Sequence, residues 1–169
     1  MPQELLINNK IESDRIIKIT SFKKGIRRTT PHKHNNYFEI IYLSQGNGYH
    51  YIDLNKYAIT PPVMFFIRQE QVHYWDITSE PDGYVVIICK PFVEQSLDSE
   101  LKSLLAQISS ECCLQLSDTN TIEKLLQLLT EENNLSGINN FQITEGLLKS
   151  LLAKVFEVSQ HITTKQEHK

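Results

Sequence analysis

The stretch PHKHNNYFEIIYLSQG, residues 31–46, brings two histidines, a glutamate and an apolar run together in one short segment. Side chains two positions apart on a strand point to the same face of a sheet, so His32 and His34 are expected to enter one cavity. The asparagine pair that follows them predicts a turn, because asparagine tolerates turn conformations. The next strand then returns beside the histidines and carries Glu39 with it. A buried carboxylate needs a compensating partner, and the two imidazoles are suited to supply it.

The strand after this turn has one face that suits the interior of a barrel. Ile41 and Leu43 share the face of Glu39, and both are apolar. In the later run QVHYWD, His73 and Trp75 share one face of another predicted strand. If that face is also inward, His73 joins the first set. Trp75 is then either a core aromatic or a flat apolar wall for a ligand.

The three histidines and the glutamate form a set that can hold a divalent transition metal. Imidazole nitrogens and carboxylate oxygens bind Fe, Mn, Ni, Cu or Zn. The same groups can instead form a metal-free network of hydrogen bonds, and the sequence leaves both interpretations open. The candidate metal ligands are His32, His34, Glu39 and His73, and Zn, Ni, Mn and Fe are the candidate ions.

Two further side chains are candidates for the same interior or for its rim. His50 shares a face with Ile52 and can lie either inside or at the rim. Arg28 can reach an anionic ligand at the mouth of the barrel, or it can belong to a solvated basic rim. The sequence predicts no catalytic residue.

The chain changes character near residue 92. Before it, short runs rich in β-branched and aromatic residues alternate with turn signals, which is typical of an antiparallel sandwich or barrel. Turns are expected at residues 46–48, 61–62 and 80–83, where glycine, proline, asparagine and aspartate gather. Strands are expected in seven runs, which are RIIKITSF, YFEIIYLS, YHYIDL, KYAIT, VMFFIR, VHYWDI and YVVIIC.

After residue 92 the apolar pattern acquires a helical period. Stripes over residues 101–108, 122–129 and 143–156 predict helices. Asn120 is expected to cap the second helix, with Glu123 reaching back to it. The fold class is therefore mainly β with an α appendage: a barrel over residues 1–92, helices over 93–162 and a polar tail over 163–169. A homodimer contact is expected through the third stripe, at Leu148, Leu151, Leu152 and Val155; the alternative is that the stripe packs onto the barrel or is covered by the preceding helix.

Composition and charge exclude several classes of protein. The 169 residues carry a formal net charge of -3, which argues against a strong nucleic-acid binder, so we expect no sequence-specific DNA binding by this chain. The sequence contains neither an apolar run of ~18 residues nor a signal peptide. The three cysteines, an odd number with two adjacent, favour a reduced cytoplasmic protein. The adjacent pair, Cys112 and Cys113, lacks the spacing of a metal or redox site.

The spacing His32-x-His34-x4-Glu39-x6-Gly46, with a histidine in a later strand, resembles the two cupin motifs. Gly25 lies one residue further upstream than the first motif usually places it, and TPPV replaces the expected Pro-x-Gly turn of the second. The longer segment from His34 to Asp76 is similar to the N-terminal sensor domain of AraC-family transcriptional regulators. This resemblance extends over about residues 15–160.

The resemblance implies a cupin-like double-stranded β-helix, or jelly-roll, barrel followed by dimerisation helices. It implies a small-molecule effector such as a carbohydrate, bound in the barrel. Contact with DNA is expected only through a further domain that would follow the tail, and we expect no enzyme activity. The alternative is a small metallo-cupin enzyme, an oxygenase or isomerase, that uses the four candidate metal ligands. The candidate effector-binding residues are His32, His34, Glu39, His73, Trp75 and His50.

Overall fold

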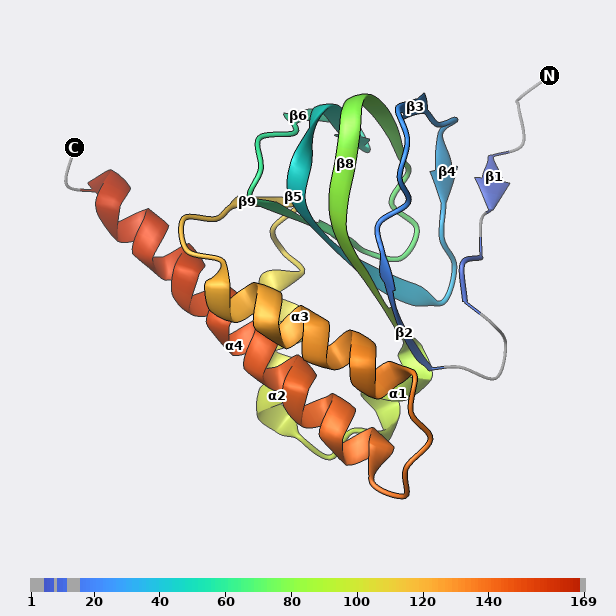
Figure 1. Ribbon diagram of the computed structural model, residues 1–169, viewed down its shortest axis with the longest axis vertical. Coiled ribbons are helices and arrows are strands. Elements are labelled where there is room, and N and C mark those ends of the chain that lie inside the picture. The colour runs from blue at the N-terminus through green and yellow to red at the C-terminus, as the bar shows by residue number, and fades with distance from the viewer. Residues whose placement is uncertain (1–4, 8, 12–15, 168–169) are drawn as a thin grey trace.

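A computed structural model of the chain describes residues 5–7, 9–11 and 16–167, with side chains up to Val158. Within these residues nine strands form one sheet, in the order β1-β4-β8-β5-β7-β9, with β2 and β3 paired to β8 and β6 paired to β5. The short strands are β1 (Leu6–Ile7), β2 (Ile17–Ser21), β3 (Arg27–Arg28), β4 (His32–Lys33), β6 (Asn55–Ala58), β7 (Val63–Ile67) and β9 (Cys113–Gln115). The fold is mainly β with C-terminal helices, as the sequence predicts (Figure 1).

The long strands β5 (Tyr37–Ile52) and β8 (His73–Cys89) form the central antiparallel pair. Their ladder extends from Tyr37 opposite Cys89 to Ile52 opposite His73. Both strands curl, so the sheet bends over itself and encloses a buried side without closing completely (Figure 1). We call this enclosed side the barrel interior.

The turns predicted at residues 46–48 and 80–83 are wrong, because β5 and β8 continue through both segments. The register between the two strands shifts three times from Leu43 to Gly48, which marks bulges in an otherwise continuous ladder. A Cβ atom on Gly48, whose φ is +122°, would lie 2.0 Å from the carbonyl oxygen of Asp76. Glycine is therefore required here for the close approach of two strands.

The alternation of side chains along β5 supplies two apolar clusters, one on each face. Ile41 and Leu43 point into the barrel interior, where they pack with Phe65 and Trp75. Ile40 and its outward-facing neighbours contribute to a second cluster under the helices. The predicted period of two is confirmed along this strand.

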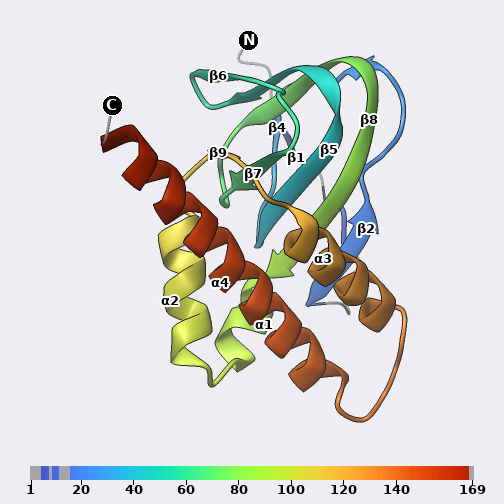
Figure 2. The ribbon, with the colours of Figure 1, turned by 60° about the vertical axis from the view of Figure 1, so that its left-hand side comes forward.

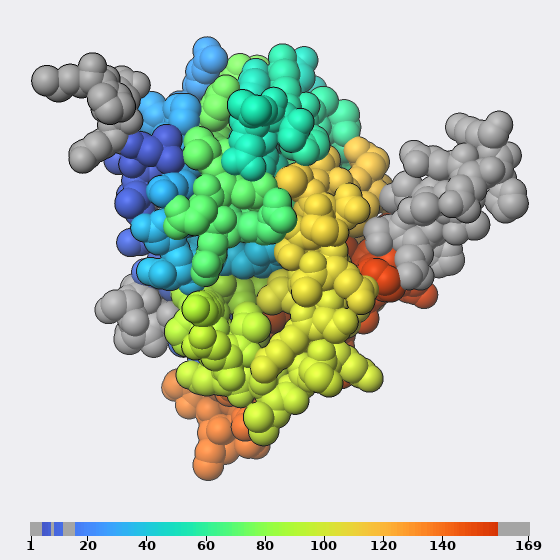
Figure 3. All heavy atoms as spheres, turned by 180° about the vertical axis from the view of Figure 1, so that it is seen from behind, coloured from blue at the N-terminus to red at the C-terminus, as the bar shows by residue number. Residues whose placement is uncertain are grey.

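The helices cover the outer face of the sheet (Figure 2). α1 (Lys90–Gln95), which the sequence does not predict, directly follows β8, and α2 (Ser99–Ile108), α3 (Asn120–Asn133) and α4 (Asn140–Glu167) contain the three predicted stripes. Seen from behind, the segment from α1 through α2 to β9 runs from the lower part of the molecule up to the sheet (Figure 3). None of the helices among the described residues has the length and apolar character needed to span a membrane.

The apolar stripe of α4 is covered by its own chain. Leu148, Leu151, Leu152 and Val155 are all 0% exposed and belong to the cluster between the sheet and the helices. The prediction that these side chains form a dimer contact is therefore wrong. An amphipathic stripe shows that a helix face is buried but does not show what buries it.

The predicted cap of α3 by Asn120 is also wrong. The residue before the helix is Thr119, and no side chain forms the N-cap hydrogen bond. Glu123 does not reach back to Asn120; its carboxylate accepts a hydrogen bond from the Tyr42 hydroxyl of β5. The Glu123 side chain therefore binds a residue of the sheet and not the backbone at the start of its own helix.

Candidate functional site

Three neighbouring strands bring the predicted histidines into the barrel interior. His32 of β4 lies directly opposite His73 of β8 in the sheet. After His34 the chain bends, and Asn36 adopts a positive φ of 69°, which an asparagine tolerates. The bend places Glu39 of β5 on the same inner side. His32, His34, Glu39 and His73 therefore lie together, and we call these four residues the histidine centre.

The distances within the histidine centre are those of direct contact. His34 Nε2 lies 2.7 Å from His73 Nε2 and 3.2 Å from Glu39 Oε2. His73 Nε2 lies 3.8 Å from the same carboxylate oxygen. The ring of His32 lies 4.4 Å from that of His73, centroid to centroid. All four residues are buried, and Glu39 is 0% exposed.

The histidine centre extends along β5 and β8 through His50 and Trp75. His50 is 0% exposed and points inward, with its Nε2 atom 2.9 Å from His73 Nδ1. Its ring stacks on that of Trp75 at 3.5 Å, and Trp75 also contacts Phe65 edge-on. Trp75 is therefore a buried core aromatic in this structure. Arg28, the candidate for an anionic ligand, lies exposed on β3.

Two residues that the sequence does not mark as candidates contact the histidine centre. The Lys10 ammonium lies 2.8 Å from Glu39 Oε1. The Tyr37 hydroxyl accepts a hydrogen bond from the Lys10 backbone N–H and lies 2.7 Å from His34 Nδ1. Lys10 belongs to an irregular N-terminal segment without any periodic signal. Tyr37 lies just after the bend, three positions from His34, and this closeness to the motif is the only signal for it.

The histidine centre holds one negatively charged group, the carboxylate of Glu39. Burial acts to raise the pKa of Glu39, but the Lys10 ammonium and the nearby imidazoles outweigh it and hold that pKa well below its usual range. Burial lowers the pKa of His73 to about 3, and it lowers the pKa values of His50 and His32 as well. At neutral pH these three imidazoles are therefore uncharged around an ionised carboxylate.

The hydrogen bonds assign the protons of the imidazoles. The Tyr37 hydroxyl accepts from Lys10, so its own proton is directed to His34 Nδ1, and His34 Nε2–H faces the His73 ring. His73 then donates from Nδ1 to His50. His32 donates from Nδ1 to the carbonyl oxygen of Thr30, 2.8 Å away. These assignments follow from donor and acceptor partners and not from observed hydrogens.

Two buried acceptor atoms of the histidine centre, His32 Nε2 and Glu39 Oε2, accept no well-formed hydrogen bond, although His34 Nε2 lies 3.2 Å from the carboxylate oxygen. Unpartnered buried polar atoms are uncommon in native proteins, and each calls for an explanation such as a ligand or an ion. Both atoms belong to side chains that are buried in the barrel interior. The histidine centre is thus a set of acceptors without enough donors.

The donor set fits a divalent transition metal. His32, His34 and His73 each offer a ring nitrogen, and these atoms lie within 4.8 Å of one another. Glu39 Oε2 adds an oxygen on the same side. His34 can offer Nε2 as a ligand if its proton moves to Nδ1 and is donated to Tyr37. When bound, such an ion would act as a Lewis acid held by these four residues.

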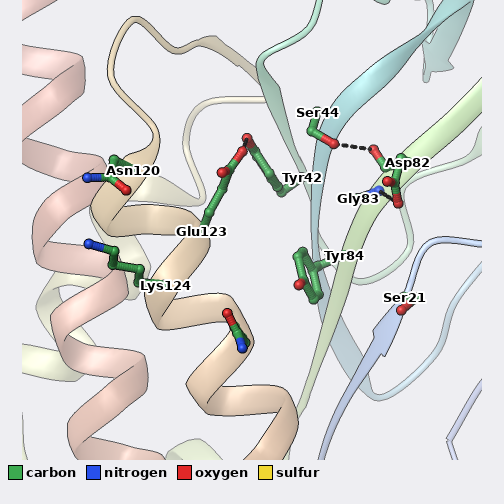
Figure 4. A pocket seen from close by; sticks show the side chains of 10 residues that line it. Ser21, Tyr42, Ser44, Asp82, Gly83, Tyr84, Asn120, Glu123 and Lys124 are labelled. Carbon is green, nitrogen blue, oxygen red and sulfur yellow. Dashed lines mark hydrogen bonds between the residues drawn. The ribbon is translucent and has the colours of Figure 1, made fainter.

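Several cavities among the described residues lie outside the histidine centre, and two of them border β5. One, of about 570 Å³, lies beside the N-terminal segment and is lined by Asn9, Ile11, Ile16, Asn35, Asn36, Tyr37, Cys89, Lys90, Pro91 and Glu94. The other, of about 340 Å³, lies between the outer face of the sheet and α3, and its lining includes Tyr42, Tyr84 and Glu123 (Figure 4). We call this second cavity the outer groove. Glu123 points from α3 toward Tyr42 across it.

Comparison with known families identifies the chain. The AraC-like ligand binding domain matches residues 25–152. The chain belongs to this family. The resemblance of the residue pattern to AraC-family sensor domains is thereby confirmed. No curated protein matches the chain.

Solved structures with a similar fold share little sequence with this AraC-like domain. A predicted oxalate decarboxylase from Thermotoga maritima is 22% identical, with a TM-score of 0.37 over 44% of this chain and 66% of that one. A cupin protein from Bacteroides fragilis is 20% identical, with a TM-score of 0.37 over 49% and 69%. ToxT from Vibrio cholerae is 14% identical, with a TM-score of 0.45 over 86% and 58%. The chain thus spans about two thirds or less of the first and last of these proteins.

Proposed function

We propose that this AraC-like domain is the ligand-sensing part of a transcription regulator and binds a small-molecule effector at the histidine centre. The observation that carries the proposal is the pair of unpartnered buried acceptors, His32 Nε2 and Glu39 Oε2, inside the barrel interior. A bound molecule with hydrogen-bond donors, such as a carbohydrate, would satisfy both atoms. His73, His50 and Trp75 complete the proposed contact set.

The effector would act by binding two arrangements of the domain with different affinity. A ligand shifts a conformational equilibrium only by that difference. The proposed effector-binding part is residues 1–92 and the proposed helical part is residues 93–162. The shift would reach DNA through a further domain after the tail at residues 163–169. A homodimer remains part of the proposal, with a contact that uses side chains of the helices other than the buried stripe of α4.

A library of small molecules tests the proposal by thermal shift. We expect at least one compound to raise the melting temperature of the wild type, because a ligand that binds only the folded state stabilises it. His32→Phe keeps an aromatic ring and removes the unpartnered nitrogen, so this variant should fold and should lose the shift. Gln127→Ala, in the outer groove, is the matched control and should retain it. A shift that His32→Phe leaves unchanged would argue against the histidine centre.

A metallo-cupin enzyme is the second candidate function, and the cluster of three ring nitrogens favours it. Protein purified without chelators, loaded with Zn, Ni, Mn or Fe and then dialysed should retain the ion if the histidine centre binds metal. His73→Ala should then lose the ion. Retention of a metal alone would support a structural or effector-anchoring ion as well as an enzyme, so turnover of a substrate is the further requirement.

A further inference from the structure

The histidine centre is contacted by a cation, Lys10, from a segment that lies outside the strands of the sheet. Glu39 is 0% exposed, and its Oε1 atom lies 2.8 Å from the Lys10 ammonium. Lys10 lies in the irregular segment between β1 and β2 and reaches across 29 positions of sequence to this carboxylate. Its side chain is 34% exposed, whereas that of Glu39 is 1% exposed. The lysine therefore enters the barrel interior from the solvent side.

The lysine leaves part of the histidine centre unsatisfied. An ammonium group carries three N–H donors. Lys10 binds Glu39 Oε1, while His32 Nε2 accepts no hydrogen bond and Glu39 Oε2 has only the ring of His34, at 3.2 Å, as a close polar neighbour. A small molecule that is not tethered to the N-terminal segment can place an ammonium group to reach those acceptors. Such a ligand gains contacts that Lys10 does not make.

An open cavity lies beside the place where Lys10 enters. Asn9 and Ile11, on either side of Lys10 in the sequence, both line the cavity of about 570 Å³. Tyr37 lines the same cavity, and its hydroxyl contacts His34 of the histidine centre. A ligand in this cavity therefore contacts the two sequence neighbours of Lys10 and also Tyr37, whose hydroxyl accepts a hydrogen bond from the Lys10 backbone.

We propose that the histidine centre takes a ligand with a primary ammonium group, and that this group binds Glu39 in place of Lys10. The proposal rests on the proposed function, because it names the chemical class of the effector. Lys10 then acts as an internal counter-ion that keeps the buried carboxylate compensated until the ligand arrives. The lysine is a specificity-determining residue, since a neutral ligand cannot replace its charge beside Glu39.

Chemical rescue of Lys10→Ala tests the proposal. The substitution removes three carbons and the ammonium group, and n-propylammonium supplies the same atoms. We expect n-propylammonium to raise the melting temperature of Lys10→Ala. It should also bind Lys10→Ala about tenfold or more tightly than it binds the wild type, because the tethered lysine of the wild type competes for Glu39 at a high effective concentration. The neutral isostere n-propanol should have no such effect. If Lys10→Ala does not fold alone, the yield of refolded protein with each additive is the readout.

Two control variants complete the test. Lys10→Ala/Glu39→Gln should lose the rescue, and Lys24→Ala, which removes a lysine from an exposed pair with Asp82, should show none. Equal rescue by n-propanol, or rescue that survives Glu39→Gln, would overturn the proposal. Stabilisation of Lys10→Ala by Zn²⁺ but not by n-propylammonium would overturn it in favour of a metal site.

The outcome also separates this proposal from the proposed function. A neutral library compound that binds wild-type protein at the histidine centre, without rescue by n-propylammonium, would support the sensing function and overturn the ammonium class. Rescue by n-propylammonium, in a protein to which no library compound binds, would support the ammonium site and contradict the sensing function.

Discussion

Removal of Lys10 should destabilise the domain far more than removal of an exposed lysine. Lys10→Met keeps the aliphatic stem but leaves the carboxylate of Glu39 buried without its cation. Breaking a buried ion pair from one side costs about 3–5 kcal/mol. Two features reduce this value: the Lys10 side chain is one third exposed, and the rings of His34 and His73 lie close enough to the carboxylate to compensate part of its charge. We therefore expect a loss of about 2–3 kcal/mol at pH 7.

Urea denaturation followed by circular dichroism measures this loss. A change of this size corresponds to a decrease of roughly 4–12 °C in melting temperature for a domain of this length. Lys24→Met is the matched control, because its pair with Asp82 is about half exposed on both sides and should contribute less than about 1 kcal/mol. Lys10→Met/Glu39→Gln should recover most of the stability, since the double variant no longer buries an unpaired charge.

The pH dependence of the difference identifies its cause. The low pKa of Glu39 in the wild type depends on Lys10, so the carboxyl group of Lys10→Met takes up a proton at a higher pH. The wild type gains stability from the ionised carboxylate above the unfolded pKa, and this gain is lost as the pH falls. The difference between the two proteins should therefore shrink in acid. A Lys10→Met protein as stable as Lys24→Met at pH 7, or a difference that does not change with pH, would refute the reasoning.

Three other predictions concern the core, a strand bulge and the histidines. Leu151→Ala should cost about 2–5 kcal/mol at every protein concentration, because the side chain is 0% exposed within its own chain, and a cost that varies with concentration would indicate a dimer contact instead. Gly48→Ala should destabilise the domain by at least about 1–3 kcal/mol, because the new Cβ atom would lie 2.0 Å from the Asp76 carbonyl oxygen. If this variant is as stable as the wild type, the bulge relaxes to make room for the methyl group. The free energy of unfolding should rise with pH between about 4 and 6.5. In this range His73 binds a proton in the unfolded chain but not in the folded protein, where its pKa is lowered to about 3. A free energy from urea melts that does not change with pH would show that the buried imidazoles are not neutral.

The alternation of side chains between the two faces of a strand accounts for most of what the sequence predicts about the histidine centre. The two-residue spacing of His32 and His34 places both on one face, and Glu39 shares its face with apolar neighbours on β5. The same rule places His73 and Trp75 together on β8. These expectations are local, since each depends only on the geometry of one strand or one bend. The roles of the residues as effector or metal ligands remain predictions.

Features that depend on distant parts of the chain are beyond this local reasoning. Lys10 reaches Glu39 from an irregular segment, and no periodicity marks a single lysine for a buried contact. The glycine-rich segment at residues 46–48 has the composition of a turn, yet the strand continues through it because β8 supplies partners on both sides. The stripe of α4 indicates a buried helix face, but whether the sheet or a second chain covers it depends on packing.

A crystal structure of the domain with the compound that raises its melting temperature most decides whether the effector site lies in the barrel interior. We expect density for the compound in contact with Glu39 and His32, with the two unpartnered acceptors now hydrogen-bonded to it. A compound bound in the outer groove beside Tyr42 and Glu123, with the histidine centre unchanged, would contradict the proposed site.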